Sequence, residues 1–191
     1  IDTQEILDFK NKFNINSDEK VILWAGRLSK EKGALQVEKV ITKLVDKNYK
    51  VKLLLAGGDV FSNNKIENFI ISPGWLNEDQ MRVVFEISDL VLVPSIYPDP
   101  FPTVVLEAMQ SGTPVVSTCF GGAKEAVSNN VTGLIINPFN IDIFFKSVEE
   151  ILLNKKLHSK MSKESKIKFE KFFSIDICMK KYLDLIHKSI I

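Results

Sequence analysis

The chain has 191 residues, of which 45% are hydrophobic and 26% charged, a composition typical of a globular protein with one sizeable core. Its 25 basic and 24 acidic residues nearly cancel, so no overall field favours nucleic acid or an anionic membrane, and any anion site must be local. Cys119 and Cys178 are too few for a disulfide framework or a paired-cysteine metal site.

The amino end is not typical of a secreted or membrane-anchored protein. No apolar run approaches the roughly 20 residues that a membrane span needs, and the first residues lack the basic and apolar regions of a signal peptide. Together with the low cysteine content, this favours a cytoplasmic location. The chain begins without Met, in a charged segment that resembles a helix, so we expect it to be a piece of a longer protein.

Short apolar runs alternate with helical patterns after a first helical segment over about residues 3–13. The expected strands are 21–25, 51–56, 69–72, 90–94, 114–118 and 133–136, and the expected helices are 34–47, 78–88, 103–111, 123–128 and 142–153. Asn77 is a suitable N-cap for the helix that follows it, and Asn48 a suitable stop for the helix before it. The pattern predicts an α/β fold with a doubly wound, Rossmann-like parallel sheet of about six strands and helices on both faces.

The tail, residues 155–191, is predicted to form two helices with no further strand. Its first part is rich in lysine, with Leu157, Met161, Ile167 and Phe172 near one face. A membrane-surface helix would need a larger apolar face and usually a tryptophan. We therefore favour a helix packed on the domain with a solvated lysine face.

Ligands of open parallel sheets bind beyond the carboxyl ends of the strands. Glycine, charged and aromatic residues follow most of the predicted strands. They are Arg27, Gly57, Gly58, Asp59, Gly74, Trp75, Asp99, Gly121, Gly122 and Glu125. We therefore expect one ligand site at this edge of the sheet.

The loop at residues 26–33 has the character of a phosphate site. Arg27 offers a planar fork and Lys32 a mobile point charge, which together match the two charges of a pyrophosphate ester. Gly33 would let the backbone approach an anion closely at a helix start, where free N–H groups also favour negative charge. Taken alone, the pattern also fits a surface turn.

A second segment, residues 98–107, carries two carboxylates across a helix start. Pro102 suits the first helical position, and the N–H groups of Thr103 and Val104 are free to meet an anionic or hydroxyl ligand. The residues around Glu107 are apolar on all sides, so we expect a buried helix and a carboxylate withdrawn from water. With Asp99, this carboxylate could hold sugar hydroxyls, which makes the two segments typical of a nucleotide-sugar site.

Over residues 21–138 the chain resembles the retaining glycosyltransferases of the two-domain GT-B type, group 1 or GT4-like. The matching motifs are Gly-Arg-x4-Lys-Gly at 26–33, Gly-Trp at 74–75, Ser-Asp-Leu-x3-Pro-Ser at 88–95, acidic-x7-Glu at 99–107, Ser-Gly-Thr-Pro-Val-Val at 111–116, Gly-Gly-x2-Glu at 121–125 and Thr-Gly-Leu at 132–134. Each is weak alone, but their order and spacing make a specific set.

The resemblance implies that residues 1–191 form a single nucleotide-sugar-binding domain, the carboxy-terminal half of such an enzyme. Arg27 and Lys32 would contact the diphosphate and Glu107 the ribose hydroxyls. Asp99 and the backbone after Phe101 would hold the transferred sugar. The residues implied in catalysis are Arg27, Lys32, Asp99 and Glu107. The residues implied in donor binding are Gly26, Arg27, Lys32, Gly33, Gly74, Trp75, Asp99, Phe101, Pro102, Thr103, Val104 and Glu107.

The resemblance also implies the remaining partners. The donor would be a UDP or GDP sugar whose base lies near the loop at 72–75, and no metal or other cofactor is expected, since Arg27 and Lys32 would neutralise the phosphates. The acceptor would be a glycan or a lipid-linked glycan, with possible peripheral membrane association of the whole enzyme. Because the acceptor half precedes this chain in the family, we expect donor binding without transfer. Two residues depart from the usual pattern: Asp99 stands in place of Glu, and Pro102 in place of Gly.

Other functions fit the residues less well. A nicotinamide dehydrogenase would need Gly-x-Gly-x-x-Gly, which 26–33 does not provide. Paired carboxylates suit a glycoside hydrolase, but a buried Glu107 beside a phosphate loop favours a diphosphate leaving group. A binding module without activity need not keep Arg27, Lys32 and Glu107 together. A sugar-nucleotide epimerase of the same architecture stays open, because it would share the phosphate and ribose contacts.

Overall fold

The computed structural model describes residues 1–57 and 65–190 and contains one six-stranded sheet. The strands are β1 (Lys20–Ala25), β2 (Val51–Ala56), β3 (Ile70–Gly74), β4 (Leu90–Val93), β5 (Val115–Thr118) and β6 (Gly133–Ile136). All neighbouring strands are parallel, in the order β3-β2-β1-β4-β5-β6. The predicted α/β fold with about six parallel strands is confirmed.

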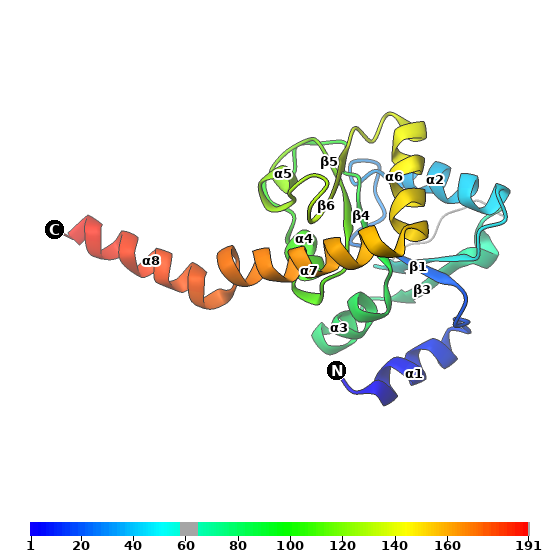
Figure 1. Ribbon diagram of the computed structural model, residues 1–191, viewed down its shortest axis with the longest axis horizontal. Coiled ribbons are helices and arrows are strands. Elements are labelled where there is room, and N and C mark those ends of the chain that lie inside the picture. The colour runs from blue at the N-terminus through cyan, green and yellow to red at the C-terminus, as the bar shows by residue number, and fades with distance from the viewer. Residues whose placement is uncertain (58–64, 191) are drawn as a thin grey trace.

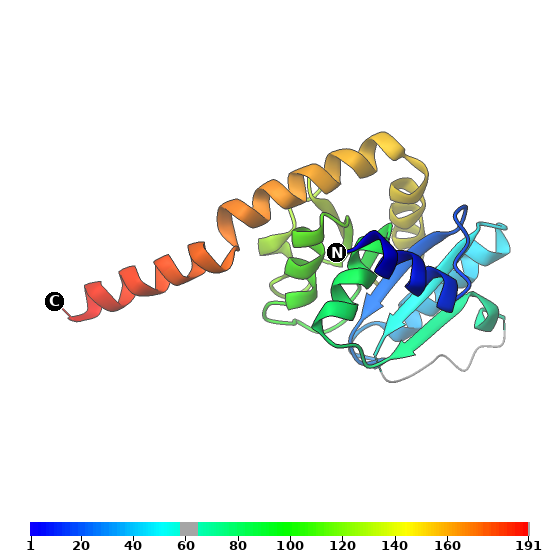
Figure 2. The ribbon, with the colours of Figure 1, turned by 90° about the horizontal axis from the view of Figure 1, so that it is seen from below.

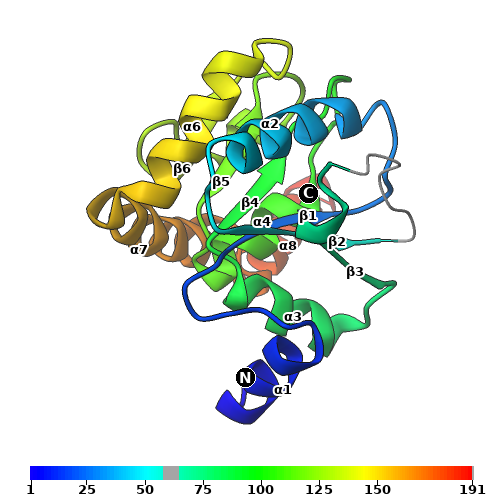
Figure 3. The ribbon, with the colours of Figure 1, turned by 90° about the vertical axis from the view of Figure 1, so that its right-hand side faces the viewer.

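Helices cover both faces of the sheet. They are α1 (Thr3–Lys12), α2 (Ala34–Asp46), α3 (Glu78–Ile87), α4 (Thr103–Ser111), α5 (Ala123–Ala126), α6 (Ile141–Leu153), α7 (Lys155–Phe172) and α8 (Ile175–Ile190), with a short 3-10 turn η1 (Glu67–Phe69) before β3. Apolar residues of α2 and α6 pack in one core, and those of α3, α4 and α5 in the other. Figure 3 shows α2 and α6 on one side of the sheet and α1 and α3 on the other.

The strands are recognisable from the sequence because their side chains are buried on both faces. Val21, Ile22, Leu23 and Trp24 are all buried, and they alternate between the two cores. A parallel strand between two helical layers therefore reads as a continuous apolar run. Where polar residues interrupt the pattern the boundaries differ: β3 begins at Ile70, after η1, and extends to Gly74.

The predicted helix boundaries follow local hydrogen bonding. Asn77 caps α3 through a reciprocal pair of bonds with Gln80, as its type and position indicated. Asn48 has a left-handed φ of 60° just after α2, which confirms it as the stop. Helix α5 has only four residues and is shorter than predicted, because it ends at Ala126.

The tail forms two helices, as predicted. Helix α7 lies across α4 and α6, and its Met161 is fully buried. Ser165 Oγ donates to the Thr132 carbonyl at 2.9 Å, and His158 Nε2 lies 2.8 Å from the Asp89 carbonyl oxygen. Helix α8 projects away from the rest of the chain (Figures 1 and 2). Over the described ranges, no helix has both the length and the apolarity to cross a bilayer.

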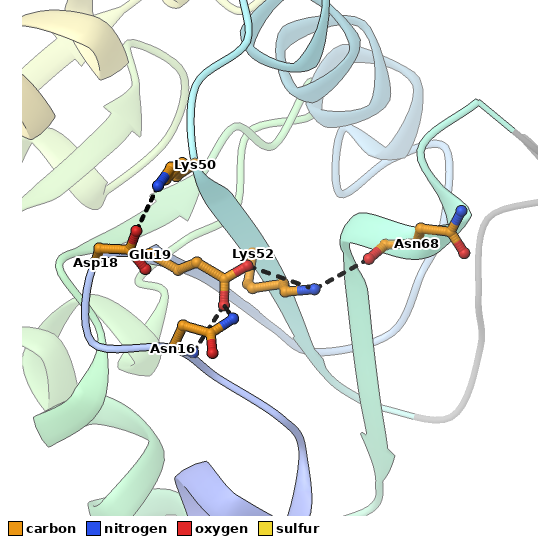
Figure 4. A network of polar contacts seen from close by, with 6 residues as sticks. All are labelled: Asn16, Asp18, Glu19, Lys50, Lys52 and Asn68. Atoms are coloured by element: carbon orange, nitrogen blue, oxygen red, sulfur yellow. Dashed lines mark hydrogen bonds and ion pairs between the residues drawn. The ribbon is translucent and has the colours of Figure 1, made fainter.

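Polar contacts secure the amino ends of β1 and β2 (Figure 4). The Glu19 carboxylate accepts from the backbone N–H of Asn16 at 2.8 Å and lies 3.6 Å from Lys52 Nζ. Lys52 also donates to the Asn68 carbonyl at 3.1 Å. These bonds join the loop before β1 to β2 and η1. The strand order reverses at β1, because β2 and β3 lie on one side of it and β4, β5 and β6 on the other. In such sheets the ligand binds at the carboxyl ends of the strands, which is the edge opposite these contacts.

Candidate functional site

A hollow of about 340 Å³ opens at the carboxyl edge of the sheet. Its walls come from the ends of β1 and β2, the segment after β3, and the first turn of α4. The lining residues are Ala25, Gly26, Lys32, Ala56, Trp75, Leu76, Met81, Pro102, Thr103, Val104 and Glu107. Seven of these are sequence-predicted site residues, from three segments far apart in the chain. Two larger hollows, of about 490 and 450 Å³, lie at the surface between α2 and α6, and their lining includes several lysines and Asp142.

The start of α4 presents backbone donors to this hollow. Pro102 is the N-cap and provides no side-chain hydrogen bond to the first turn. The first N–H groups of a helix have no intrahelical partner, and the helix dipole favours negative charge there. Pro102, Thr103 and Val104 all line the hollow, so this helix start can receive an anion.

Lys32 is the cationic side chain of the hollow, and it is already paired. Its Nζ lies 2.6 Å from Asp99 Oδ2, and 5.2 Å from the centre of the Tyr97 ring. The Tyr97 hydroxyl donates to the same Asp99 oxygen at 3.1 Å. The resemblance implied that Lys32 contacts the diphosphate and that Asp99 holds the transferred sugar. In the structure, Lys32 and Asp99 instead contact one another.

Both members of this pair are charged at neutral pH. Burial lowers the pKa of Lys32, but its hydrogen bonds to Asp99 and Tyr97 outweigh that cost and leave the pKa above its ordinary value. Burial likewise raises the pKa of the Asp99 carboxyl, yet the bonds from Lys32, Tyr97 and the Phe101 backbone hold it below the ordinary value. The pair is therefore an ion pair at the edge of the hollow.

Glu107 lines the hollow but is not buried as the sequence suggested. Its side chain is exposed, on the same stripe of α4 as the exposed Thr103 and Gln110. Only Val105, Ala108 and Met109 are fully covered, so α4 is amphipathic and not buried on every side. The residues next to Glu107 in the sequence are apolar, as expected. Residues three and four positions apart share one face of a helix, however, so α4 keeps a polar face, which is turned toward the hollow.

The carboxylate of Glu107 is nevertheless affected by its surroundings. Burial among the walls of the hollow raises its pKa above the ordinary value, and a hydrogen bond from the Thr103 side chain opposes this in part. Solvent reaches the group through the mouth of the hollow, while protein atoms replace part of its water shell. Such a carboxylate can accept hydrogen bonds from ligand hydroxyls.

Five predicted residues lie next to the hollow without lining it. Arg27 is exposed in the loop after β1. The pKa of Glu31 in this loop is lowered by hydrogen bonds from its own backbone and from Ser29, with a smaller contribution from Arg27. Phe101 packs against Phe173 of the tail, with ring centres 6.2 Å apart. Gly74 precedes Trp75, whose side chain is 74% exposed on the rim. Asp99 does not line the hollow, but it contacts Lys32, which does.

Gly33, the fifth, has a steric role. It caps α2 with a left-handed φ of 84°, and a Cβ there would lie 2.2 Å from the Pro94 carbonyl oxygen. The loop that carries Lys32 thus rests directly on the end of β4, which only glycine permits.

Several contributors were not predicted. Ala25, Ala56, Leu76 and Met81 form the apolar part of the wall. Their positions at strand ends and in the first turn of α3 could have indicated this, but nothing in their side chains points to a ligand. Tyr97 was missed because its partner lies two residues on, a spacing without a recognisable motif. Gly58 and Asp59 lie outside the described residues. Over the part of the chain that the structure describes, no three His, Cys, Asp or Glu residues gather as a metal site.

Comparisons with known proteins agree on one family. The family model of glycosyl transferases group 1 matches residues 5–168. An uncharacterized glycosyltransferase of Methanocaldococcus jannaschii is 31% identical over 157 residues, which cover 78% of this chain and 40% of that protein. A lipopolysaccharide 1,2-N-acetylglucosaminetransferase of Salmonella typhimurium is 29% identical over 182 residues, or 86% of this chain and 48% of the enzyme. The chain thus spans less than half the length of these relatives.

A solved structure shows the same fold. Anabaena HepE, crystallised with UDP-glucose, superposes with a TM-score of 0.86 at 19% identity. The match covers 98% of this chain and 54% of HepE. At this identity the likeness concerns the fold, and it includes the whole sheet and the tail helices.

Proposed function

Because the chain belongs to the glycosyl transferases group 1 family, we propose that it is the donor-binding domain of a glycosyltransferase. Its ligand is a nucleoside diphosphate sugar of the UDP or GDP type, held in the hollow at the carboxyl edge of the sheet. The observation that carries the proposal is the convergence of seven predicted donor residues on one hollow. HepE, of the same fold, was crystallised with UDP-glucose, which supports this ligand class.

The phosphates would lie at the start of α4. Lys32 lines the hollow and Arg27 stands in the same loop, so the two cations can neutralise a pyrophosphate from one side. Thr103 and Val104 line the same space, and their first-turn N–H groups have no partner within the helix, so they can donate to phosphate oxygens. These groups also stabilise the nucleoside diphosphate as it leaves, because its negative charge grows when the bond to the sugar breaks.

The nucleoside would occupy the apolar part of the hollow. Glu107 offers a carboxylate to the ribose hydroxyls. Trp75, Leu76 and Met81 provide flat or flexible apolar surface for the base. The acceptor, a glycan or a lipid-linked glycan, would bind to the preceding part of the longer protein. Transfer would retain the anomeric configuration and take place in the cytoplasm, with peripheral membrane association of the whole enzyme.

Isothermal titration calorimetry tests the ligand class. UDP, GDP, ADP and inorganic phosphate are titrated in turn, and we expect at least one nucleoside diphosphate to bind much more tightly than phosphate. Arg27→Ala is expected to weaken diphosphate binding far more than nucleoside binding. Lys30→Ala is a matched control, since Lys30 is exposed in the same loop and lies outside the hollow. Binding of UDP, GDP and ADP no tighter than that of inorganic phosphate would overturn the proposal.

The full-length protein tests the reaction. Given donor with and without a sugar acceptor, a transferase releases nucleotide only when acceptor is present. Interconversion of the donor without any acceptor would instead indicate an epimerase.

A further inference from the structure

Phe101 stands directly before the helix start that lines the hollow. Pro102, Thr103 and Val104 follow it in the chain, and all three are lining residues. Pro102 caps α4 without a side-chain hydrogen bond, so no capping side chain fixes the first turn. The position of this turn therefore depends on what holds residues 99–101.

The loop after β5 holds the backbone of this segment. The Gly122 N–H donates to the Asp99 carbonyl at 2.8 Å. A Cβ at Gly122 would collide with the Pro100 carbonyl oxygen and would lie 3.4 Å from Phe101 Cα, so the two loops are in direct contact. This contact secures the main chain and leaves the Phe101 ring to be held by another part of the protein.

The tail holds the Phe101 ring. Its centre lies 6.2 Å from the centre of the Phe173 ring, and the two planes are inclined at 47°. Aromatic pairs are favourable in offset or tilted arrangements with their centres about 4.5–7 Å apart. Phe101 is 37% exposed, whereas Phe173 packs against the core formed with α3, α4 and α5. Phe173 thus connects an exposed loop residue to that core.

Phe173 is itself fixed, at the junction between α7 and α8. Its backbone N–H donates to the Phe169 carbonyl at 2.8 Å and closes the end of α7. Lys168 Nζ lies 6.0 Å from the centre of the Phe173 ring. The same ammonium donates to the Ala126 carbonyl and to Ser128 Oγ, which ties α7 to the chain after α5. The ring therefore belongs to a firmly attached part of the tail.

We propose that Phe173 is a positioning residue for the donor site, which holds the start of α4 through the Phe101 ring and does not itself contact the ligand. The inference rests on the proposed donor site. Phe173 is not among the residues that line the hollow, so its effect passes through the loop. Without the ring, the loop samples other positions, and the apparent affinity falls in proportion to the fraction of molecules that keep the binding position.

Calorimetry with UDP in a double-mutant cycle tests the proposal in the full chain. Phe173→Ala is expected to weaken UDP binding about threefold to tenfold, the range that loss of an aromatic pair gives. Phe101→Ala should weaken it as well. In the Phe101→Ala background, Phe173→Ala should have no further effect, because Phe173 acts only through that ring.

Phe13→Ala is the matched control. Phe13 pairs with Phe9 at the end of α1, with ring centres 4.7 Å apart, and packs against the same core as Phe173. Neither residue of this pair lines the hollow. Phe13→Ala should therefore lower the free energy of unfolding, as Phe173→Ala does, and leave the UDP affinity unchanged.

Two further measurements keep the test decisive. Phe173→Leu keeps most of the apolar volume and removes the ring, so it should weaken UDP binding by a smaller factor even if Phe173→Ala folds poorly. Fluorine NMR of para-fluorophenylalanine incorporated at position 101 reports on the loop directly. Its resonance should shift and broaden in Phe173→Leu without UDP, sharpen when UDP is added, and stay unchanged in Phe13→Ala.

The outcomes separate this role from the proposed function. Unchanged UDP affinity in both Phe173 variants, an equal loss in Phe13→Ala, or a Phe173→Ala effect that persists without the Phe101 ring overturns the positioning role alone. A wild-type protein that binds no UDP overturns the proposed function and this role with it.

Discussion

The loop that carries Lys32 depends on a glycine, and replacing that glycine gives a quantitative prediction. Gly33→Ala would place a Cβ 2.2 Å from the Pro94 carbonyl oxygen and 3.0 Å from its carbon, at a φ of 84°. The left-handed conformation costs an alanine about 1–2 kcal/mol. Relieving the clash requires α2 or the end of β4 to shift, which costs about 1–3 kcal/mol more. We therefore expect the free energy of unfolding to fall by about 2–5 kcal/mol.

Gly74→Ala separates the two contributions. Gly74 has nearly the same φ, 79°, but nothing lies within 4 Å of its Cβ position. The free energy of unfolding of this variant should therefore fall only by the cost of the left-handed conformation, about 1–2 kcal/mol. Urea unfolding measures both, with unchanged m-values as the check that the unfolded states are comparable. If Gly33→Ala lowers the free energy of unfolding by no more than Gly74→Ala does, the close approach of this loop to the end of β4 adds no cost, and the prediction is contradicted.

Two further variants test the site wall and the tail. Because burial raises the pKa of Glu107, its ionised form opposes folding above the folded-state pKa, and this penalty vanishes as the pH falls below the ordinary value of 4.5. Glu107→Gln should thus raise the melting temperature at about pH 7 but not at about pH 3.5. The same change should lower the affinity for nucleotide. A lower melting temperature of the variant at neutral pH would contradict the stability argument. Lys168 Nζ donates to the Ala126 carbonyl at 2.5 Å and to Ser128 Oγ at 2.9 Å, so Lys168→Met should cost about 1–3 kcal/mol in urea unfolding. The exposed Lys163→Met should stay within about 0.5 kcal/mol, and equal losses would refute the role of Lys168.

Much of the fold could be predicted because each strand is buried on both faces. A run such as residues 21–25 carries its own signal, and the glycines and prolines after each run mark the strand ends. The parallel direction then places every strand end on one edge, so Gly26, Trp75 and Thr103 were correctly expected near one another. The place of each residue in the fold was therefore more predictable than the exposure and the contacts of its side chain.

What the sequence could not provide were contacts between distant side chains. The pairing of Lys32 with Asp99 spans 67 residues and depends on how the loops after β1 and β4 meet. Glu107 is less buried than predicted, for a related reason. Composition alone showed apolar neighbours, but the helical positions of Thr103 and Gln110 leave one face of α4 open.

Tryptophan fluorescence tests most directly whether nucleotide occupies this hollow. The chain has two tryptophans: Trp24 is buried at 4% exposure, and Trp75 is 74% exposed on the rim. Base stacking near Trp75 should change its emission, so UDP is expected to give a saturable signal with the affinity found by calorimetry. Trp75→Phe should abolish that signal. UDP binding in the calorimeter without any change in wild-type emission would place the nucleotide elsewhere and contradict the account.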